Sequence, residues 1–118
     1  MINSKFDLED RTTRFSEQII LLCKKAQKNP ISYPLLNQLI RSATSIGANY
    51  FEANGASSKK DFKNKISICR KEARETKYWL QLLGKSSDDL IQTCRNLWKE
   101  AHELTLIFSK IVINTKDK

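Results

Sequence analysis

The region from residue 62 to residue 83 places mainly apolar side chains at alternating intervals of four and three residues, and no other feature constrains the fold as strongly. These positions are Phe62, Ile66, Cys69, Ala73, Thr76, Leu80 and Leu83. A mean interval of about 3.5 residues keeps them on one face of an α-helix and is typical of helices that pack side by side. The same spacing recurs in three further sets: Leu8, Thr12, Phe15, Ile19, Leu22 and Ala26; Leu36, Ile40, Ala43, Gly47 and Tyr50; and Leu90, Cys94, Leu97, Ala101, Leu104, Phe108 and Ile111. The sequence therefore predicts four amphipathic helices.

Three short segments rich in turn-forming residues separate these helices. They hold Asn29-Pro30 with Tyr33-Pro34, then Asn54-Gly55, and then Gly84 with Ser86-Ser87. The predicted helices span residues 8–28, 34–53, 58–83 and 87–111, with N-caps at Asp7, Ser58 and Ser86 and a frayed tail at 114–118. Helices joined by short loops run antiparallel to their neighbours. The predicted fold class is therefore all-α, an antiparallel up-down-up-down four-helix bundle that forms one domain over residues 1–118.

The composition is basic. The 21 Lys and Arg residues outnumber the 13 Asp and Glu residues, which gives a formal net charge of +8 and a pI of about 9.5. An excess of this kind attracts polyanions such as nucleic acid. Cys23, Cys69 and Cys94 show no metal-site or disulfide spacing, so we expect buried, reduced thiols in a cytoplasmic protein. No run approaches the roughly 18 to 20 apolar residues that cross a bilayer, so we expect neither membrane insertion nor secretion.

The third predicted helix carries a row of positive charge. At about 100° per residue, seven of the eight basic residues between positions 59 and 77 fall within about 120° of arc. We call these seven the basic stripe: Lys59, Lys60, Lys63, Arg70, Lys71, Arg74 and Lys77. Its length of about 27 Å suits contact with successive phosphates of a nucleic acid. The alternative interpretation is a solvated face that serves only solubility.

A second arc of the same helix mixes large apolar and acidic side chains. We call it the mixed flank: Asp61, Ile68, Glu72, Glu75, Trp79 and Leu82. An apolar centre with a charged rim is the usual anatomy of a subunit interface, so these residues are the predicted contact between copies of the chain. The competing interpretation is that Trp79 widens the core of the bundle.

Catalytic and metal-binding patterns are missing from the sequence. His102 is the only histidine, and the residue three positions before it is Lys99, so the Glu-x-x-His pattern of di-iron bundles is absent. No Gly-rich phosphate loop, G-x-S-x-G elbow or H-E-x-x-H sequence occurs. We therefore expect no enzyme activity, no cofactor and no metal.

Two segments resemble a known family. They are Arg41-Ser42-Ala43-Thr44-Ser45-Ile46-Gly47-Ala48-Asn49-Tyr50-Phe51-Glu52-Ala53 and Lys71-Glu72-Ala73-Arg74-Glu75-Thr76-Lys77-Tyr78-Trp79-Leu80, with Ser58-Lys59-Lys60-Asp61-Phe62 before the second. They are similar to the four-helix bundle proteins named after open reading frames inside 23S rRNA intervening sequences. The resemblance covers nearly the whole chain from Phe6 onward. This chain departs from the common Glu-Gly turn of the family at Glu52-Ala53-Asn54-Gly55.

The resemblance implies a homopentamer with a basic surface. In the related accessory proteins of diversity-generating retroelements, that surface engages RNA and a reverse transcriptase. The positions that match the family's polar and aromatic signature are Asn49, Glu52, Glu72, Glu75 and Trp79, and we assign them to packing or to subunit contact.

The leading hypothesis is a homo-oligomer that binds RNA or DNA through phosphate contacts with little reading of bases, because aromatic residues do not interleave with the basic stripe. The alternative is a protein-interaction scaffold or accessory subunit without a nucleic-acid role. Peripheral membrane binding is a weaker third hypothesis, since the apolar face of the helix is committed to the bundle.

Overall fold

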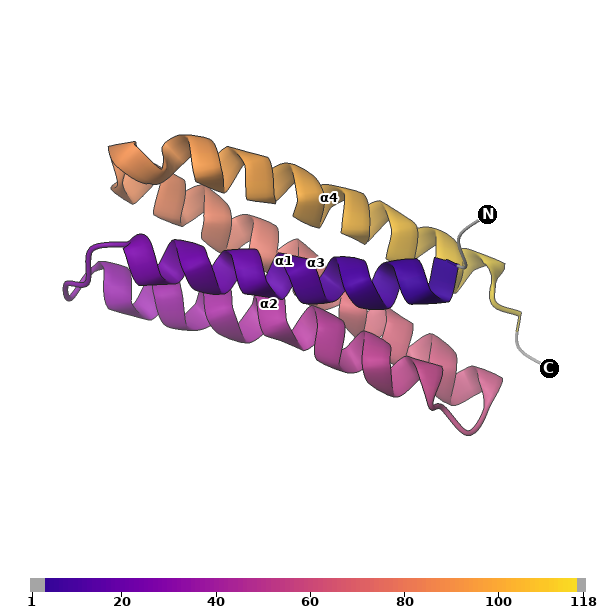
Figure 1. The fold of residues 1–118 in the computed structure, drawn as a ribbon. Coiled ribbons are helices and arrows are strands. Elements are labelled where there is room, and N and C mark those ends of the chain that lie inside the picture. Colours follow the sequence, from indigo (N-terminus) through magenta and orange to yellow (C-terminus); the bar gives the residue numbers. More distant parts are fainter. Residues whose placement is uncertain (1–3, 117–118) are drawn as a thin grey trace.

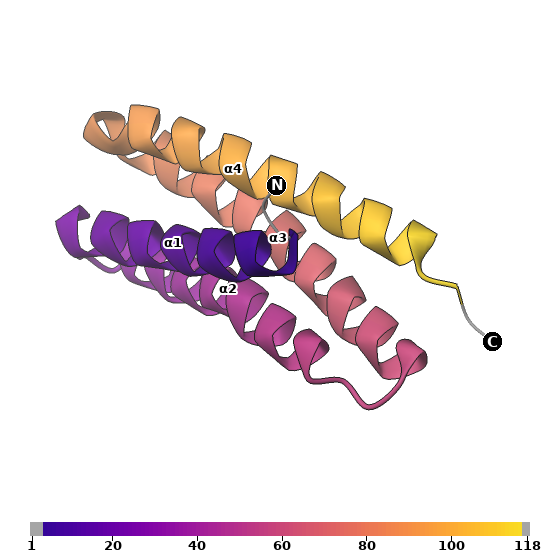
Figure 2. The same ribbon diagram turned by 45° about the vertical axis from the view of Figure 1, so that its right-hand side comes forward.

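The computed structural model describes residues 4–116, and this part of the chain forms four long helices (Figure 1). Helix α1 spans Ser4–Lys25, α2 spans Ser32–Asn54, α3 spans Lys59–Ser86 and α4 spans Ile91–Asn114. A single 3-10 turn, η1, covers Asp88–Leu90 before α4. The chain reverses at each joint, so that consecutive helices lie side by side (Figures 1 and 2). The predicted all-α, four-helix class is confirmed.

Two of the joints show how local sequence starts a helix. The side-chain oxygen of Asn29 accepts hydrogen bonds from the backbone N–H groups of Ile31 and Ser32, both at 2.9 Å, and so supports the first turn of α2. The hydroxyl of Ser58 accepts the N–H of Asp61 at 3.0 Å. The predicted N-cap at Ser58 is therefore confirmed.

Other predicted helix ends are wrong. Helix α1 begins at Ser4, so Asp7 lies inside it and not before it. The same helix ends at Lys25 because Lys28 folds back and donates its ammonium group to the carbonyl oxygens of Cys23 and Lys24, at 2.7 and 2.9 Å. Helix α4 extends to Asn114, so it takes in the first residue of the predicted tail at 114–118; residues 117 and 118 of that tail lie outside the described residues.

The joint between α3 and α4 also differs from the prediction. Gly84 does not end α3, which continues to Ser86, and Ser86 donates its hydroxyl to the carbonyl oxygen of Leu83 instead of capping α4. The space around Gly84 explains why a glycine stands there. A Cβ atom at this position would lie 3.3 Å from the Cβ of Cys94, so the missing side chain lets α3 and α4 approach closely.

In α1, α3 and α4 the core is made of the predicted apolar positions. In α2 it is made of a set shifted along the helix. Leu39 and Ile46 are fully buried, whereas Ile40 is 36% exposed and Gly47 is only partly buried. Both registers share Leu36, Ala43 and Tyr50, so spacing alone could not distinguish them. The largest fully buried side chains are Phe15, Phe108, Ile19, Leu39, Ile46, Ile66, Leu80, Leu83 and Leu104.

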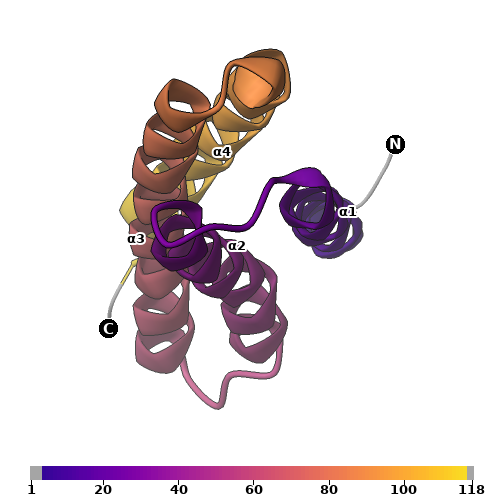
Figure 3. The same ribbon diagram turned by 90° about the vertical axis from the view of Figure 1, so that its left-hand side faces the viewer.

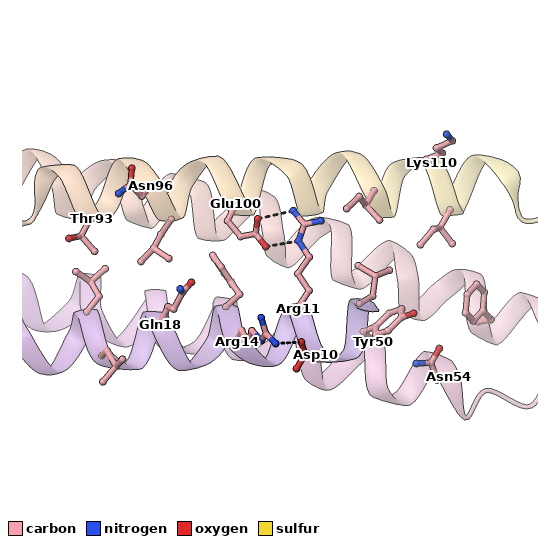
Figure 4. Close-up of a pocket in the computed structure, with 18 of the residues that line it drawn as sticks. Asp10, Arg11, Arg14, Gln18, Tyr50, Asn54, Thr93, Asn96, Glu100 and Lys110 are labelled. Carbon is pink, nitrogen blue, oxygen red and sulfur yellow. Dashed lines mark hydrogen bonds and ion pairs between the residues drawn. The ribbon is translucent and has the colours of Figure 1, made fainter. Parts of the chain in front are cut away.

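Helix α1 packs on α2 but stands away from α4, as the view along the helices shows (Figure 3). The groove between α1 and α4 has a volume of about 1530 Å³ and includes Leu21, Leu97 and Ile107 in its lining. Arg11 of α1 crosses it to Glu100 of α4, with nitrogen-to-oxygen distances of 2.6 and 2.8 Å (Figure 4). Arg11 also donates to Glu103 at 2.7 Å. These hydrogen bonds raise the pKa of Arg11, so the guanidinium stays charged and holds the two helices together.

All three cysteines are free and buried, as predicted. Burial raises the pKa of Cys23 and Cys94 to about 11 and that of Cys69 to about 12. At pH 8 a thiol with a pKa near 11 is ~0.1% thiolate, whereas an unfolded cysteine with a pKa of ~8.5 is about one quarter thiolate. Only the thiolate reacts with disulfide reagents.

We therefore expect the native protein to resist Ellman's reagent at pH 8 and to release three equivalents of thiol once urea unfolds it. Raising the pH from 8 to 9.5 increases the thiolate fraction of a thiol with a pKa near 11 about thirtyfold, to ~3%, but the native protein should still react much more slowly than the unfolded chain because its sulfur atoms are buried. Rapid labelling of one native cysteine at pH 8 would contradict the burial of that residue.

Candidate nucleic-acid interface

The seven residues of the basic stripe all lie on α3, which runs unbroken from Lys59 to Ser86. None of the seven is buried: Lys59, Lys60, Lys71 and Arg74 are exposed, and Lys63, Arg70 and Lys77 are half-buried. A single helix holds them at fixed intervals along about 27 Å. The stripe is therefore a rigid row of cations on the outside of the bundle.

Most of the stripe has no acidic partner. Between residues 8 and 116, where side chains are described, six of its members have no carboxylate oxygen within ion-pair distance: Lys59, Lys60, Arg70, Lys71, Arg74 and Lys77. Cations crowded on one face repel one another, and an anion that binds there removes this repulsion. The stripe is thus a ready surface for a polyanion.

Ion pairs between α2 and α3 form on another side of α3. Arg41 donates to Glu72 at 3.2 Å and also to Glu75, and Lys65 donates to Glu52 at 2.9 Å. The hydrogen bond to Glu52 raises the pKa of Lys65. Arg41 and Glu52 are the only charged residues of α2. The sequence contained this signal, because the two charges of α2 match opposite charges on α3, but the prediction did not pair them.

The residues of the mixed flank differ in the contacts that they make within the chain. Glu72 is 8% exposed, and both Glu72 and Glu75 accept hydrogen bonds from Arg41. Trp79 packs against the core, and its indole nitrogen is buried without a hydrogen-bond partner in the described part of the chain. All three residues thus have contacts within the chain, and a contact between subunits through them stays a prediction. Asp61 and Leu82 are half-buried and Ile68 is 36% exposed, so a subunit contact through these residues also stays a prediction.

The signature positions on α2 also make contacts inside the chain. Asn49 donates its side-chain amide to the carbonyl oxygen of Ser45 at 2.8 Å, and Glu52 accepts from Lys65. The first contact lies within α2, and the second joins α2 to α3.

One end of the basic stripe meets an aromatic pair from α4. The indole ring of Trp98 and the imidazole ring of His102 are stacked, with centroids 5.2 Å apart and planes 13° from parallel. The ammonium nitrogen of Lys77 lies 5.1 Å from the centroid of the Trp98 ring and donates to Nδ1 of His102 at 3.1 Å. The sequence of α3 alone does not indicate this cluster, because its aromatic residues come from another helix.

The described residues contain no group of three His, Cys, Asp or Glu side chains placed to hold a metal ion. No helix between residues 4 and 116 combines the length and the apolar character needed to cross a bilayer. What the structure does present is a row of cations and a neighbouring aromatic pair.

These features define a class, that of small all-α helical-bundle proteins with one cationic helix face. A sequence profile described as "23S rRNA-intervening sequence protein" matches residues 4–110. The chain belongs to this family. A comparison with curated proteins gave no match.

A solved structure has the same fold. It is a protein of unknown function from the S23 ribosomal protein family of Bacteroides thetaiotaomicron VPI-5482, 31% identical to this chain. The superposition covers 95% of this chain and 100% of the other, with a TM-score of 0.85. The agreement supports the arrangement of the four helices over almost their full length.

Proposed function

We propose that this protein is a non-enzymatic, homo-oligomeric nucleic-acid-binding protein, that RNA is its ligand, and that the basic stripe of α3 is the contact surface. The observation that carries the proposal is the row of six exposed or half-exposed cations without a carboxylate partner among the described side chains. Lys65 of the same helix and Arg41 of α2, by contrast, each meet a carboxylate. The description of the family refers to 23S rRNA, which supports RNA over DNA.

The contacts of the stripe are with phosphates. Lysine and arginine side chains on a straight helix reach successive backbone phosphates, which fixes the position of the nucleic acid but carries no sequence information. The stripe alone therefore binds RNA with little preference for sequence.

Self-association is the second part of the proposal. The outer surface carries large apolar side chains that one chain leaves exposed, among them Leu21, Leu106 and Phe51, which are 57, 56 and 74% exposed. A second copy that covers such side chains removes them from water. It would also bring several basic stripes into one assembly and so increase the avidity for a long RNA.

The test is the salt dependence of RNA binding by the unmodified protein. The association constant for a fluorescein-labelled RNA duplex should fall as salt is added. A plot of its logarithm against the logarithm of the salt concentration should be linear, with a slope of about −6 if all seven cations meet phosphates. Fluorescence anisotropy between 50 and 300 mM KCl measures this slope. Binding that does not weaken with salt, or no binding at 50 mM KCl, would exclude the stripe as a phosphate contact.

A further inference from the structure

A cavity of about 330 Å³ lies between the C-terminal part of α3 and the start of α4. Its lining is Leu80, Gln81, Gly84, Lys85, Ile91, Cys94, Arg95 and Trp98. The volume is at the lower end of the range of about 300 to 1,000 Å³ for ligand pockets, so it suits one small planar group and excludes a helix. Gly84 is part of the lining, and its missing side chain keeps this part of the wall open.

The aromatic wall of the cavity is held in place. Trp98 is stacked on His102 and lies beside the ammonium group of Lys77, as described above. Because Lys77 also donates to His102, the three side chains restrict one another's rotation. A fixed, partly exposed indole is the type of surface on which nucleobases stack, and a side chain that is already ordered loses little entropy when the base binds.

Three residues of the lining have exposed polar or basic side chains. Lys85 and Arg95 are exposed lining residues, and no Asp or Glu side chain belongs to the lining. Gln81 is exposed beside them and offers both an amide donor and a carbonyl acceptor. The lining thus combines an aromatic wall, apolar residues at Leu80 and Cys94, and two exposed basic residues.

We propose that this cavity binds one unpaired nucleobase of a single-stranded RNA, with Trp98 as the stacking surface and with Lys85 and Arg95 on the adjacent phosphates. Lys77 belongs to the basic stripe and its ammonium nitrogen also lies 5.1 Å from the centroid of the Trp98 ring, so the stripe ends beside the wall of the cavity. The inference rests on the proposed function and adds a preference to it. The stripe binds any RNA, and the cavity selects RNA with a base free of pairing.

An apolar side chain of a protein partner fits the same cavity less well. Such a side chain needs only the apolar lining residues, and it leaves Lys85 and Arg95 without an anion. A nucleotide uses the aromatic wall, the apolar residues and the basic residues together. The two occupants also give different results in the experiment below.

The experiment compares two labelled probes, a 12-nucleotide single-stranded RNA of mixed sequence and the duplex of the same RNA with its complement. Changing Trp98→Ala should weaken binding of the single strand by about 5- to 100-fold, the loss that corresponds to one stacked base, and should weaken binding of the duplex by less than about 2-fold. Trp98→Phe should restore most of the single-strand affinity. Equal losses for both probes, or no loss for the single strand, would overturn the inference. Neither result would affect the proposed function, which salt-dependent binding of the wild-type protein tests separately.

A second set of variants guards against misfolding of Trp98→Ala. Gln81→Phe enlarges an exposed side chain of the lining and should reduce single-strand binding without truncating any wall residue. In a Trp79→Phe background Trp98 is the only tryptophan, and its fluorescence should be quenched by the single strand but not by the duplex. A change in Trp98 emission that follows protein concentration instead of RNA would mean that a second copy fills the cavity, which overturns the inference. If the wild-type protein binds neither probe, the inference and the proposed function fail together.

Discussion

Replacing Phe108 by alanine is expected to lower the free energy of unfolding by about 3 to 5 kcal/mol. Phe108 is 0% exposed, and its ring lies 6.0 Å from that of Tyr50, so it joins α4 to α2 across the centre of the bundle. Alanine loses the transfer free energy of the ring and leaves a cavity that the surrounding helices only partly fill. Since domains of this kind are stable by about 5 to 15 kcal/mol, the change removes a large fraction of the total.

Urea unfolding followed by circular dichroism at 222 nm measures this change. Lys110→Ala is the matched control, because Lys110 stands two residues later on the same helix and is exposed. The control should change the unfolding free energy by less than about 1 kcal/mol. A loss below about 1 kcal/mol for Phe108→Ala would mean that this ring is not part of the core.

The combined change of Lys60, Lys71 and Arg74 to alanine is expected to weaken binding to duplex RNA by about 100-fold or more at 0.1 M salt. Each cation that meets a phosphate contributes about one unit to the slope of log K against log salt, so the slope should become smaller by about three. All three side chains are exposed and have no carboxylate partner among the described residues, so their removal should hardly affect the fold. Anisotropy titrations at several salt concentrations give both quantities.

The matched control changes Lys24, Lys25 and Lys110 to alanine. These residues are exposed on α1 and α4, and both triple variants remove three of the eight net positive charges. If binding depends on the stripe, the control should weaken affinity by less than about 5-fold, which is a long-range effect of net charge. Equal losses in the two variants would show that only the total charge matters and would remove α3 from the proposed function.

The number and type of the helices could be predicted from the sequence because their cause is local. Intervals of four and three residues place apolar side chains on one helix face wherever the chain goes, and the Ser58 cap depends on residues three positions apart. The register of α2 could not be predicted, since Leu39 with Ile46 and Ile40 with Gly47 satisfy the same spacing. Only the neighbouring helices decide which set is buried.

The candidate site also has one part that local sequence determines and another that depends on neighbouring helices. The basic stripe lies on one helix, so helical geometry was enough to find it. The contact between Lys77 and Trp98 joins residues of different helices, and the role of Gly84 depends on its distance from Cys94. A glycine near a helix end predicts a break by local rules, but here close helix packing accounts for it.

The way α1 is attached determines where this domain opens first. The other neighbouring helices pack along their lengths, whereas α1 meets α4 mainly through Arg11 and its two glutamates on the far side of an open groove. Because α1 still packs on α2 through buried side chains such as Phe15 and Ile19, loss of that arginine should weaken only the α4 side of its attachment, and contact with α4 is what we expect α1 to lose first.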